Sequence, residues 1–386
     1  MNILFISFDA DPPYMGGTAT VVNVLAKAFQ AKGHFVALGY FEDSSHPSEF
    51  FQCKVKLSPT NRKELESFFK KYSFDIIYNT QAMSTDFSFL KLLPLGQCKI
   101  VSAYHSRPML RFFPLESLMN LYYDSNNLIY KLYTLVKIPL LPIWKYRSQK
   151  RERLKYEEMV KYSDKIQLLS EKFYPCFLKI VPQIDKNKLV FIENPIVFDS
   201  NCTVEEVKEK KKRVVVICST NFVKRAYLMV RIWAKIEKDK ELNDWSFDFV
   251  GGGEGFERIK KMASKLGLKR IFFLGFQAPE KYYKNGAIFM MTSRFEGWPM
   301  VLMEAMQMGV VPVVFHSFES LTDIIDDGEN GCIVKDNDIE GFVDRLKWLM
   351  KNDELRISMA AKAIKSCDRF TIDKVLQKYL LMFGSL

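Results

Sequence analysis

Short apolar runs alternate with longer amphipathic segments twice along this chain of 386 residues, and no other feature limits its fold so strongly. Such runs predict parallel strands whose two faces are covered by helices. In the first half, strands are predicted at residues 3–8, 35–40, 75–78, 100–104, 166–170 and 189–192. In the second half, they are predicted at residues 214–218, 247–251, 271–274, 288–292, 311–315 and 332–334. We therefore expect an α/β fold of two tandem, doubly wound, Rossmann-like domains.

The boundary between the two domains is predicted near residues 194–213. Pro195 ends the last strand of the first half, and the charged run 204–213 lacks an apolar stripe, so it is interpreted as a solvated connector. Helices are predicted at residues 20–32, 226–238, 255–266, 299–308 and 339–351. We expect an N-terminal domain over 1–195, a C-terminal domain over 196–369, and a helix over 370–386 that packs back on the N-terminal domain.

Composition narrows the class of partner and the compartment. The net charge of +11 favours anionic partners such as phosphorylated substrates, nucleic acid or an acidic membrane surface. The seven cysteines are scattered without a C-x2-C pair, which favours a reducing cytoplasm over a disulfide framework or a zinc site. The N-terminal apolar run is short and is predicted to be a strand rather than a signal peptide. Pro139 and Pro142 interrupt the longest apolar stretch, so a transmembrane helix is not expected.

Residues 107–161 interrupt the alternation with a long segment rich in aromatic and basic side chains. Two compatible interpretations stay open. The segment is a helical insertion that packs on the N-terminal sheet, or it is a patch that contacts a membrane surface or a lipid-linked acceptor. The second interpretation is based on the mixture of aromatic and basic residues, which is common at the depth of lipid headgroups.

The segment from Glu296 to Gly309 carries the clearest chemistry. Pro299 suits the start of a helix and Gly309 the position just past its end. The residues between them are apolar on nearly every side, so Glu304 is the one carboxylate in a buried helix. The start of the helix offers N–H groups that suit a pyrophosphate, with a carboxylate on each side to accept hydrogen bonds from sugar hydroxyls. Alternatively, Glu296 caps the helix and Glu304 pairs with a core Arg or Lys.

The segment Glu-Gly-Trp-Pro-Met-Val-Leu-Met-Glu at 296–304 resembles the E-x7-E signature of retaining glycosyltransferases of family 4, which have the GT-B fold. The resemblance extends over most of the chain apart from residues 107–161. Its other landmarks are Gly16-Gly17, Gly33-His34, Phe74-Asp75, the run 100–105, Asn194-Pro195, Val250 to Gly253, Phe273 to Phe276 and Asp326 to Gly331.

The resemblance implies a role for each matching residue. Glu296 is expected to hydrogen-bond the donor sugar and Glu304 the ribose hydroxyls. His105 is expected beside the reacting sugar, although a lone histidine after a strand is more often structural. The remaining donor-binding residues are expected to be Gly16, Gly17, Gln277, Gly297, Trp298, Pro299, Met300 and Val301.

The family places a basic pair after the first strand of the second domain, and here the chain departs from the pattern. Ser219-Thr220 stand where Gly-Arg is usual, so Lys224 or Arg225 is left as the cation for the diphosphate. The alternative is that these two residues are solvated charges of a loop. No metal is expected, because such enzymes use helix dipoles and cations instead. The D-x-D at Asp9 to Asp11 is interpreted as loop polarity.

The expected function is transfer of a hexose-type sugar, with retention, from a nucleotide diphosphate sugar, UDP in preference to GDP. The expected acceptor is a glycan or a lipid-linked oligosaccharide in surface polysaccharide synthesis. We expect a cytoplasmic protein, with peripheral membrane contact through residues 107–161, and no nucleic-acid partner because no recognised motif accompanies the charge. The alternative is a non-catalytic nucleotide-sugar-binding subunit of a glycan assembly complex. A UDP-sugar epimerase of the same fold would lack the E-x7-E segment.

Overall fold

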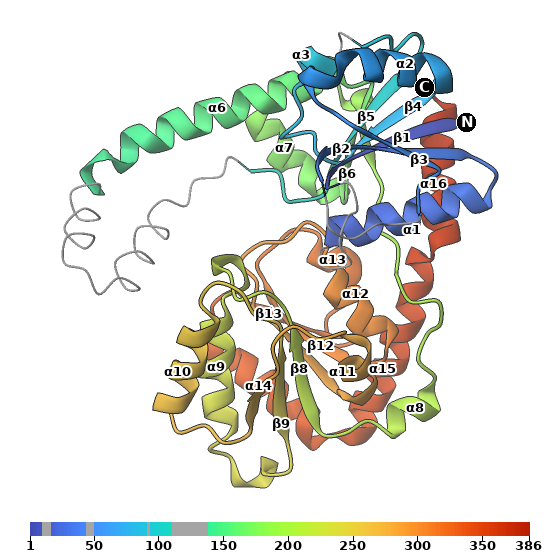
Figure 1. The fold of residues 1–386 in the computed structure, drawn as a ribbon. Coiled ribbons are helices and arrows are strands. Elements are labelled where there is room, and N and C mark those ends of the chain that lie inside the picture. The colour runs from blue at the N-terminus through green and yellow to red at the C-terminus, as the bar shows by residue number, and fades with distance from the viewer. Residues whose placement is uncertain (10–16, 44–49, 91–92, 110–137) are drawn as a thin grey trace. The chain divides into compact units, whose positions relative to one another are not determined.

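The computed structural model describes residues 1–9, 17–43, 50–90, 93–109 and 138–386 (Figure 1). The chain divides into two compact units. Unit 1 contains Met1–Asp11, His34–Phe191 and Leu386, and unit 2 contains Pro12–Gly33 and Ile192–Ser385.

Unit 1 is built on a seven-stranded parallel sheet in the order β3-β2-β1-β4-β5-β6-β7. Its strands are β1 Asn2–Asp9, β2 Phe35–Glu42, β3 Cys53–Lys56, β4 Ile76–Asn79, β5 Lys99–Tyr104, β6 Lys165–Leu168 and β7 Leu189–Phe191. Its α-helices in the described residues are α2 Arg62–Tyr72, α3 Phe87–Leu90, α6 Leu141–Tyr162 and α7 Tyr174–Ile180. The six predicted strands are confirmed. The short strand β3 was not predicted, because its sequence Cys-Lys-Val-Lys offers only one buried apolar side chain.

Helix α6 makes up most of the described part of the aromatic and basic segment 107–161. Its last turns pack on unit 1, where Tyr156 and Met159 are buried and the Tyr156 hydroxyl donates to the Tyr104 hydroxyl at 2.6 Å. Its first turns extend beyond the sheet of unit 1 (Figure 1) and expose Ile143 and Tyr146. Residues 110–137 of the segment lie outside the described residues. Among the described helices, none combines the length and apolar character that a membrane span requires.

Unit 2 is built on a six-stranded parallel sheet in the order β10-β9-β8-β11-β12-β13. Its strands are β8 Arg213–Ile217, β9 Ser246–Val250, β10 Ile271–Phe273, β11 Ile288–Met291, β12 Val311–His316 and β13 Cys332–Lys335, and all six were predicted. Its α-helices are α1 Gly17–Ala31, α8 Val204–Lys208, α9 Ala226–Ile236, α10 Phe256–Lys265, α11 Glu280–Asn285, α12 Met300–Gln307, α13 Leu321–Ile324, α14 Ile339–Lys351, α15 Asp353–Cys367 and α16 Ile372–Gly384.

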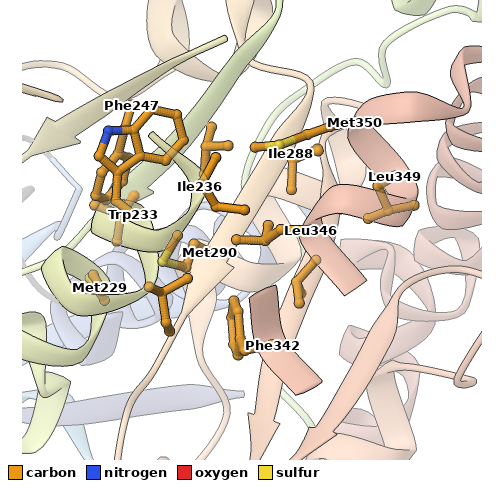
Figure 2. Packing of buried hydrophobic residues seen from close by; sticks show 14 of the residues in the cluster. Met229, Trp233, Ile236, Phe247, Ile288, Met290, Phe342, Leu346, Leu349 and Met350 are labelled. Atoms are coloured by element: carbon orange, nitrogen blue, oxygen red, sulfur yellow. The ribbon is translucent and has the colours of Figure 1, made fainter. Parts of the chain in front are cut away.

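The core of unit 2 shows why these strands are so apolar. Side chains of α9 and α14 pack against alternate residues of β9 and β11 (Figure 2). Trp233 of α9 meets Phe247 of β9 with ring centroids 5.5 Å apart. Every residue of β11 is buried, because helices cover both faces of a doubly wound sheet. The predicted α/β fold with two parallel sheets is therefore confirmed.

The connector prediction for 204–213 was wrong in part. Thr203 and Glu206 form a capping box that starts helix α8, and Val207 is buried. The last residue of the run, Arg213, begins β8. The C-terminal helix was predicted to pack back on the N-terminal domain, and α16 does contact α1, the first helix of the chain, where Phe383 stacks on Phe29 with centroids 5.6 Å apart.

Candidate functional site

The loop between β11 and α12 is held in place by hydrogen bonds to its neighbours in unit 2. The Thr292 hydroxyl donates to the Lys224 carbonyl at 2.9 Å, and the Arg294 amide donates to the Val223 carbonyl at 2.7 Å. Nearer the helix, the Ser320 hydroxyl donates to the Gly297 carbonyl at 2.6 Å. The loop that carries Glu296 is thus fixed both to the segment after β8 and to the start of α13.

Glu296 and Lys224 form an ion pair in this loop. The Lys224 ammonium donates to Glu296 Oε1 at 2.7 Å, and the two side chains expose only 21% and 14% of their surface for Lys224 and Glu296 respectively. Burial by itself lowers the pKa of Lys224, but the charge of Glu296 and the hydrogen bond to it raise that pKa by more. The ammonium therefore stays charged at neutral pH, immediately before helix α12.

Arg225 is directed elsewhere, although it is next to Lys224 in the chain. Its backbone has the left-handed conformation with φ of 50°, and its side chain is buried. The guanidinium donates to the carbonyls of Thr292 at 2.6 Å and Ser293 at 3.0 Å, and to Asp336 Oδ1 at 2.6 Å. Of the two candidate cations, Lys224 thus reaches Glu296, while Arg225 ties the segment after β8 to the end of β11.

Helix α12 begins at Met300, with Pro299 as its N-cap, and Gly309 follows its end with φ of 65°. The helix is buried apart from one face, on which Val301 and Glu304 are half-buried. The predicted helix is thus confirmed, with its start one residue later. The N-cap side chain makes no capping hydrogen bond, so the start of α12 keeps N–H groups for a ligand.

Glu304 has a neutral partner. The Tyr283 hydroxyl of α11 donates to Glu304 Oε2 at 3.0 Å and also lies 3.1 Å from the Val301 carbonyl. Burial raises the pKa of Glu304 to about 7, although the hydrogen bond from Tyr283 opposes this rise. Within the described residues, no core Arg or Lys pairs with Glu304, contrary to the structural alternative considered from the sequence. Tyr283 was not among the predicted residues.

The first turn of α1 lies against the first turn of α12. A Cβ atom on Gly17 would be 3.2 Å from Cγ of Met300, so the side chain of any other residue would crowd this place. Gly16 lies outside the described residues. Trp298 is buried and meets Phe370 edge to face, with centroids 5.3 Å apart. Two helix N-termini, each with partial positive charge, therefore approach each other beside Glu296 and Lys224.

A glycine loop follows β9 at the same edge of the sheet. Gly251 has φ of 126°, and a Cβ atom there would lie 1.9 Å from the Cys218 carbonyl oxygen, so only glycine fits. Thr220, at the departure from the family pattern, donates its hydroxyl to the Glu254 carbonyl at 2.8 Å. Phe276 is 62% exposed and its ring edge lies beside Gly252. Gln277 is exposed in the same loop after β10.

His105 directly follows β5 in unit 1 and is half-buried. Asp9 is the last residue of β1, whereas Asp11 lies outside the described residues. Over the described ranges, there is no group of three or more His, Cys, Asp or Glu side chains that could hold a metal ion.

Residues 199–366 match the family of group 1 glycosyl transferases, and this range includes Glu296, Glu304 and Lys224. The match lies within the C-terminal half of the chain. The resemblance carried by the E-x7-E segment is thereby confirmed. The three-dimensional fold is similar to that of Anabaena HepE solved with UDP-glucose, with a TM-score of 0.72 at 15% identity, covering 100% of both chains.

This chain also matches parts of two curated relatives. It is 27% identical over 165 residues to the poly(ribitol-phosphate) alpha-N-acetylglucosaminyltransferase of Staphylococcus aureus, covering 42% of this chain and 33% of the relative. It is 24% identical over 215 residues to the poly(glycerol-phosphate) alpha-glucosyltransferase of Bacillus subtilis, covering 53% of this chain and 32% of the relative. The chain thus spans about a third of the length of these two relatives.

Proposed function

We propose that this chain is a retaining glycosyltransferase that moves a hexose-type sugar from a UDP-sugar to a glycan or lipid-linked acceptor of a surface polymer. The observation that carries the proposal is the Lys224–Glu296 ion pair, set immediately before helix α12 and beside the N-terminus of α1. A cation and two helix N-termini suit a diphosphate, and a carboxylate among them suits a sugar hydroxyl.

In this proposal the donor binds unit 2. Glu296 accepts hydrogen bonds from the sugar, while N–H groups of Gly297 to Met300, with Val301 and Gly17, surround the diphosphate. Glu304 accepts hydrogen bonds from the ribose. Phe276, exposed beside the glycine loop, offers a flat face for the base, and Gln277 next to it can donate to a carbonyl of the base. Residues 1–195 bind the acceptor, with His105 next to the reacting sugar, and 196–369 bind the donor.

The proposed reaction needs no covalent link to the protein. The acceptor hydroxyl oxygen bonds to C1 of the sugar on the face that the diphosphate leaves, while the bond from C1 to the diphosphate oxygen breaks. The leaving phosphate takes the hydroxyl proton. Lys224 and the helix N-termini stabilise the charge that develops on the diphosphate, and because they are already in position they need no reorganisation.

Replacement of Glu296 tests the proposal. Glu296→Gln keeps the shape of the side chain but removes its negative charge. That charge holds the Lys224 ammonium and strengthens the hydrogen bonds accepted from the sugar. We expect transfer from the UDP-sugar to fall by about 100-fold or more, as when one preorganised group of an active site is removed. The measurement is release of UDP with each candidate acceptor, together with thermal unfolding to verify the fold. The matched control is Glu257→Gln on α10, which breaks an exposed pair with Lys260. Full activity of Glu296→Gln would overturn the assignment.

The alternative of a non-catalytic subunit makes a different prediction in the absence of acceptor. A transferase is expected to hydrolyse its UDP-sugar slowly, whereas a binding subunit is expected to bind the UDP-sugar without turnover. The departure at Ser219-Thr220 favours the binding subunit, and the intact Lys224–Glu296 pair favours the transferase. In either case we propose action in the cytoplasm, with residues 107–161 towards the membrane.

A further inference from the structure

Unit 1 has a cavity of about 400 Å³ between the loop after β4 and helix α6. Its lining consists of Met83, Ser84, Ser148, Arg151, Glu152 and Lys155. The size is in the range of sites for small ligands.

One stripe of α6 forms a wall of this cavity. Ser148, Arg151, Glu152 and Lys155 are spaced by three or four residues, so they share one face of the helix. The opposite wall is the turn at Met83 and Ser84, where the Lys155 ammonium donates to the Met83 carbonyl at 3.0 Å. This bond uses one of the three donors of the ammonium and leaves two for a ligand.

Arg151 makes no hydrogen bond or ion pair with the part of the chain that the structure describes. Its fork of N–H groups matches the oxygens of a phosphate group. The lining contains two cations, Arg151 and Lys155, and one carboxylate, Glu152, so its net charge is +1. That balance suits a singly charged phosphodiester better than a doubly charged pyrophosphate. The two serine hydroxyls and the Glu152 carboxylate can in turn bind alcohol groups.

The position of the cavity relates it to the acceptor. The loop 80–86 directly follows β4, and β5, which pairs with β4, is directly followed by His105. In open α/β sheets, ligands bind outside the carboxyl ends of the strands, and the cavity and His105 both lie there in unit 1. We infer that this cavity binds a polyol phosphodiester of the acceptor, with Arg151 and Lys155 on the phosphate and Glu152, Ser84 and Ser148 on the alcohol groups. This inference rests on the proposed function.

Binding to a defined probe tests the inference. The probe is a soluble oligomer of glycerol phosphate, titrated against the full chain by calorimetry. We expect Arg151→Gln to weaken binding by about tenfold or more, as is usual for a charge-assisted hydrogen bond. The combined Arg151→Gln and Lys155→Gln variant is expected to bind still more weakly. The matched control is Lys150→Gln, on the opposite face of α6, which is expected to bind as the unaltered chain does.

Vesicles distinguish a polymer from a lipid headgroup, since phosphatidylglycerol carries the same phosphodiester. Binding of phosphatidylglycerol vesicles, but not of the oligomer, with the same loss in Arg151→Gln, would support the cavity with a lipid as the source. The inference would be overturned if Lys150→Gln lost as much binding as Arg151→Gln, or if Arg151→Gln lost none. UDP-sugar binding and hydrolysis are measured for each variant to separate the cavity inference from the proposed function. The cavity variants are expected to leave UDP-sugar binding and hydrolysis unchanged. If the UDP-sugar does not bind but the oligomer does, only the proposed function fails.

Discussion

The two carboxyl groups of the E-x7-E segment are stabilised in different ways, although one short helix separates them. Before α12, Glu296 is paired with the Lys224 ammonium at 2.7 Å. On α12, Glu304 accepts a hydrogen bond from the neutral Tyr283 hydroxyl and pairs with no cation among the described residues, and burial raises its pKa to about 7. A carboxylate shielded from water is costly unless it is paired, so the protein supplies a cation at one position and favours a proton at the other.

The difference suggests distinct demands at the two positions in the proposed reaction. At Glu296 the carboxylate is held by the Lys224 ammonium, which suits a group that must hold a sugar and orient a cation at every turnover. At Glu304 the charge depends on pH near neutrality, so donor binding itself can change it.

Removing the cation should have the largest effect. Lys224→Met leaves the Glu296 carboxylate shielded without a partner. We expect the free energy of unfolding to fall by about 2 kcal/mol, less than for a fully buried pair because both side chains reach solvent. Transfer is expected to fall by about 100-fold, because the diphosphate loses its cation. Urea unfolding and UDP release measure the two effects.

A double change separates charge from shape at this pair. Lys224→Met combined with Glu296→Gln removes both charges, so most of the lost stability should return while transfer stays low. Lys260→Met breaks only the exposed pair with Glu257 and is expected to change stability by less than about 0.5 kcal/mol. No recovery in the double variant would mean that packing, rather than charge, dominates at Lys224.

Glu304 should make stability depend on pH with the opposite sign from an ion-paired acid. Its folded pKa of about 7 lies above the ordinary value of 4.5, so the folded state holds a proton that the unfolded state has lost. Stability from this group is therefore present below pH 4.5 and is lost as pH rises through 7. Relative to Glu304→Gln, the unaltered chain is expected to lose on the order of 2 kcal/mol between pH 5 and pH 8.

The affinity for UDP should also depend on the proton of Glu304. If the ionised carboxylate accepts from the ribose, UDP affinity should rise between pH 6 and pH 8, and this rise should be smaller in Glu304→Gln. The variant corrects for titration of UDP itself. An identical pH dependence of UDP affinity in both proteins would remove Glu304 from the ribose site.

The segment around α12 was predictable because its signals are local. Pro299 and Gly309 delimit the helix, and the apolar residues between them isolate Glu304. The partner of Glu304 was not predictable in the same way. Tyr283 is on a different helix, 21 residues earlier, and no spacing rule connects the two residues. The choice between the adjacent cations Lys224 and Arg225 was likewise not predictable, because it depends on their contacts with distant residues, Glu296 for Lys224 and Asp336 for Arg225.

Two further elements were not predicted because charged residues weaken the apolar pattern of their sequences. The charged run predicted a connector where helix α8 forms, although Thr203 and Glu206 have the spacing of a capping box. Strand β3 has two lysines among its four residues, which is usual for an edge strand and weakens the apolar pattern. The cavity beside α6 depends on a turn after β4 that meets a helix some 60 residues later, so the sequence alone gave no indication of it.

Tyr283→Phe should have the smallest effect on stability, and it tests the comparison of Glu296 with Glu304 most closely. It removes the one hydroxyl that holds the pKa of Glu304 down, so that pKa should rise further above 7. We expect a loss of about 1 kcal/mol in unfolding free energy, typical of one hydrogen bond, and a higher pH for the rise in UDP affinity. Tyr282→Phe, which alters the neighbouring residue on α11, is the control. If the pH dependence in Tyr283→Phe moved to lower pH, the hydroxyl would be favouring the protonated acid, and the contrast with the Lys224 pair would need a different electrostatic explanation.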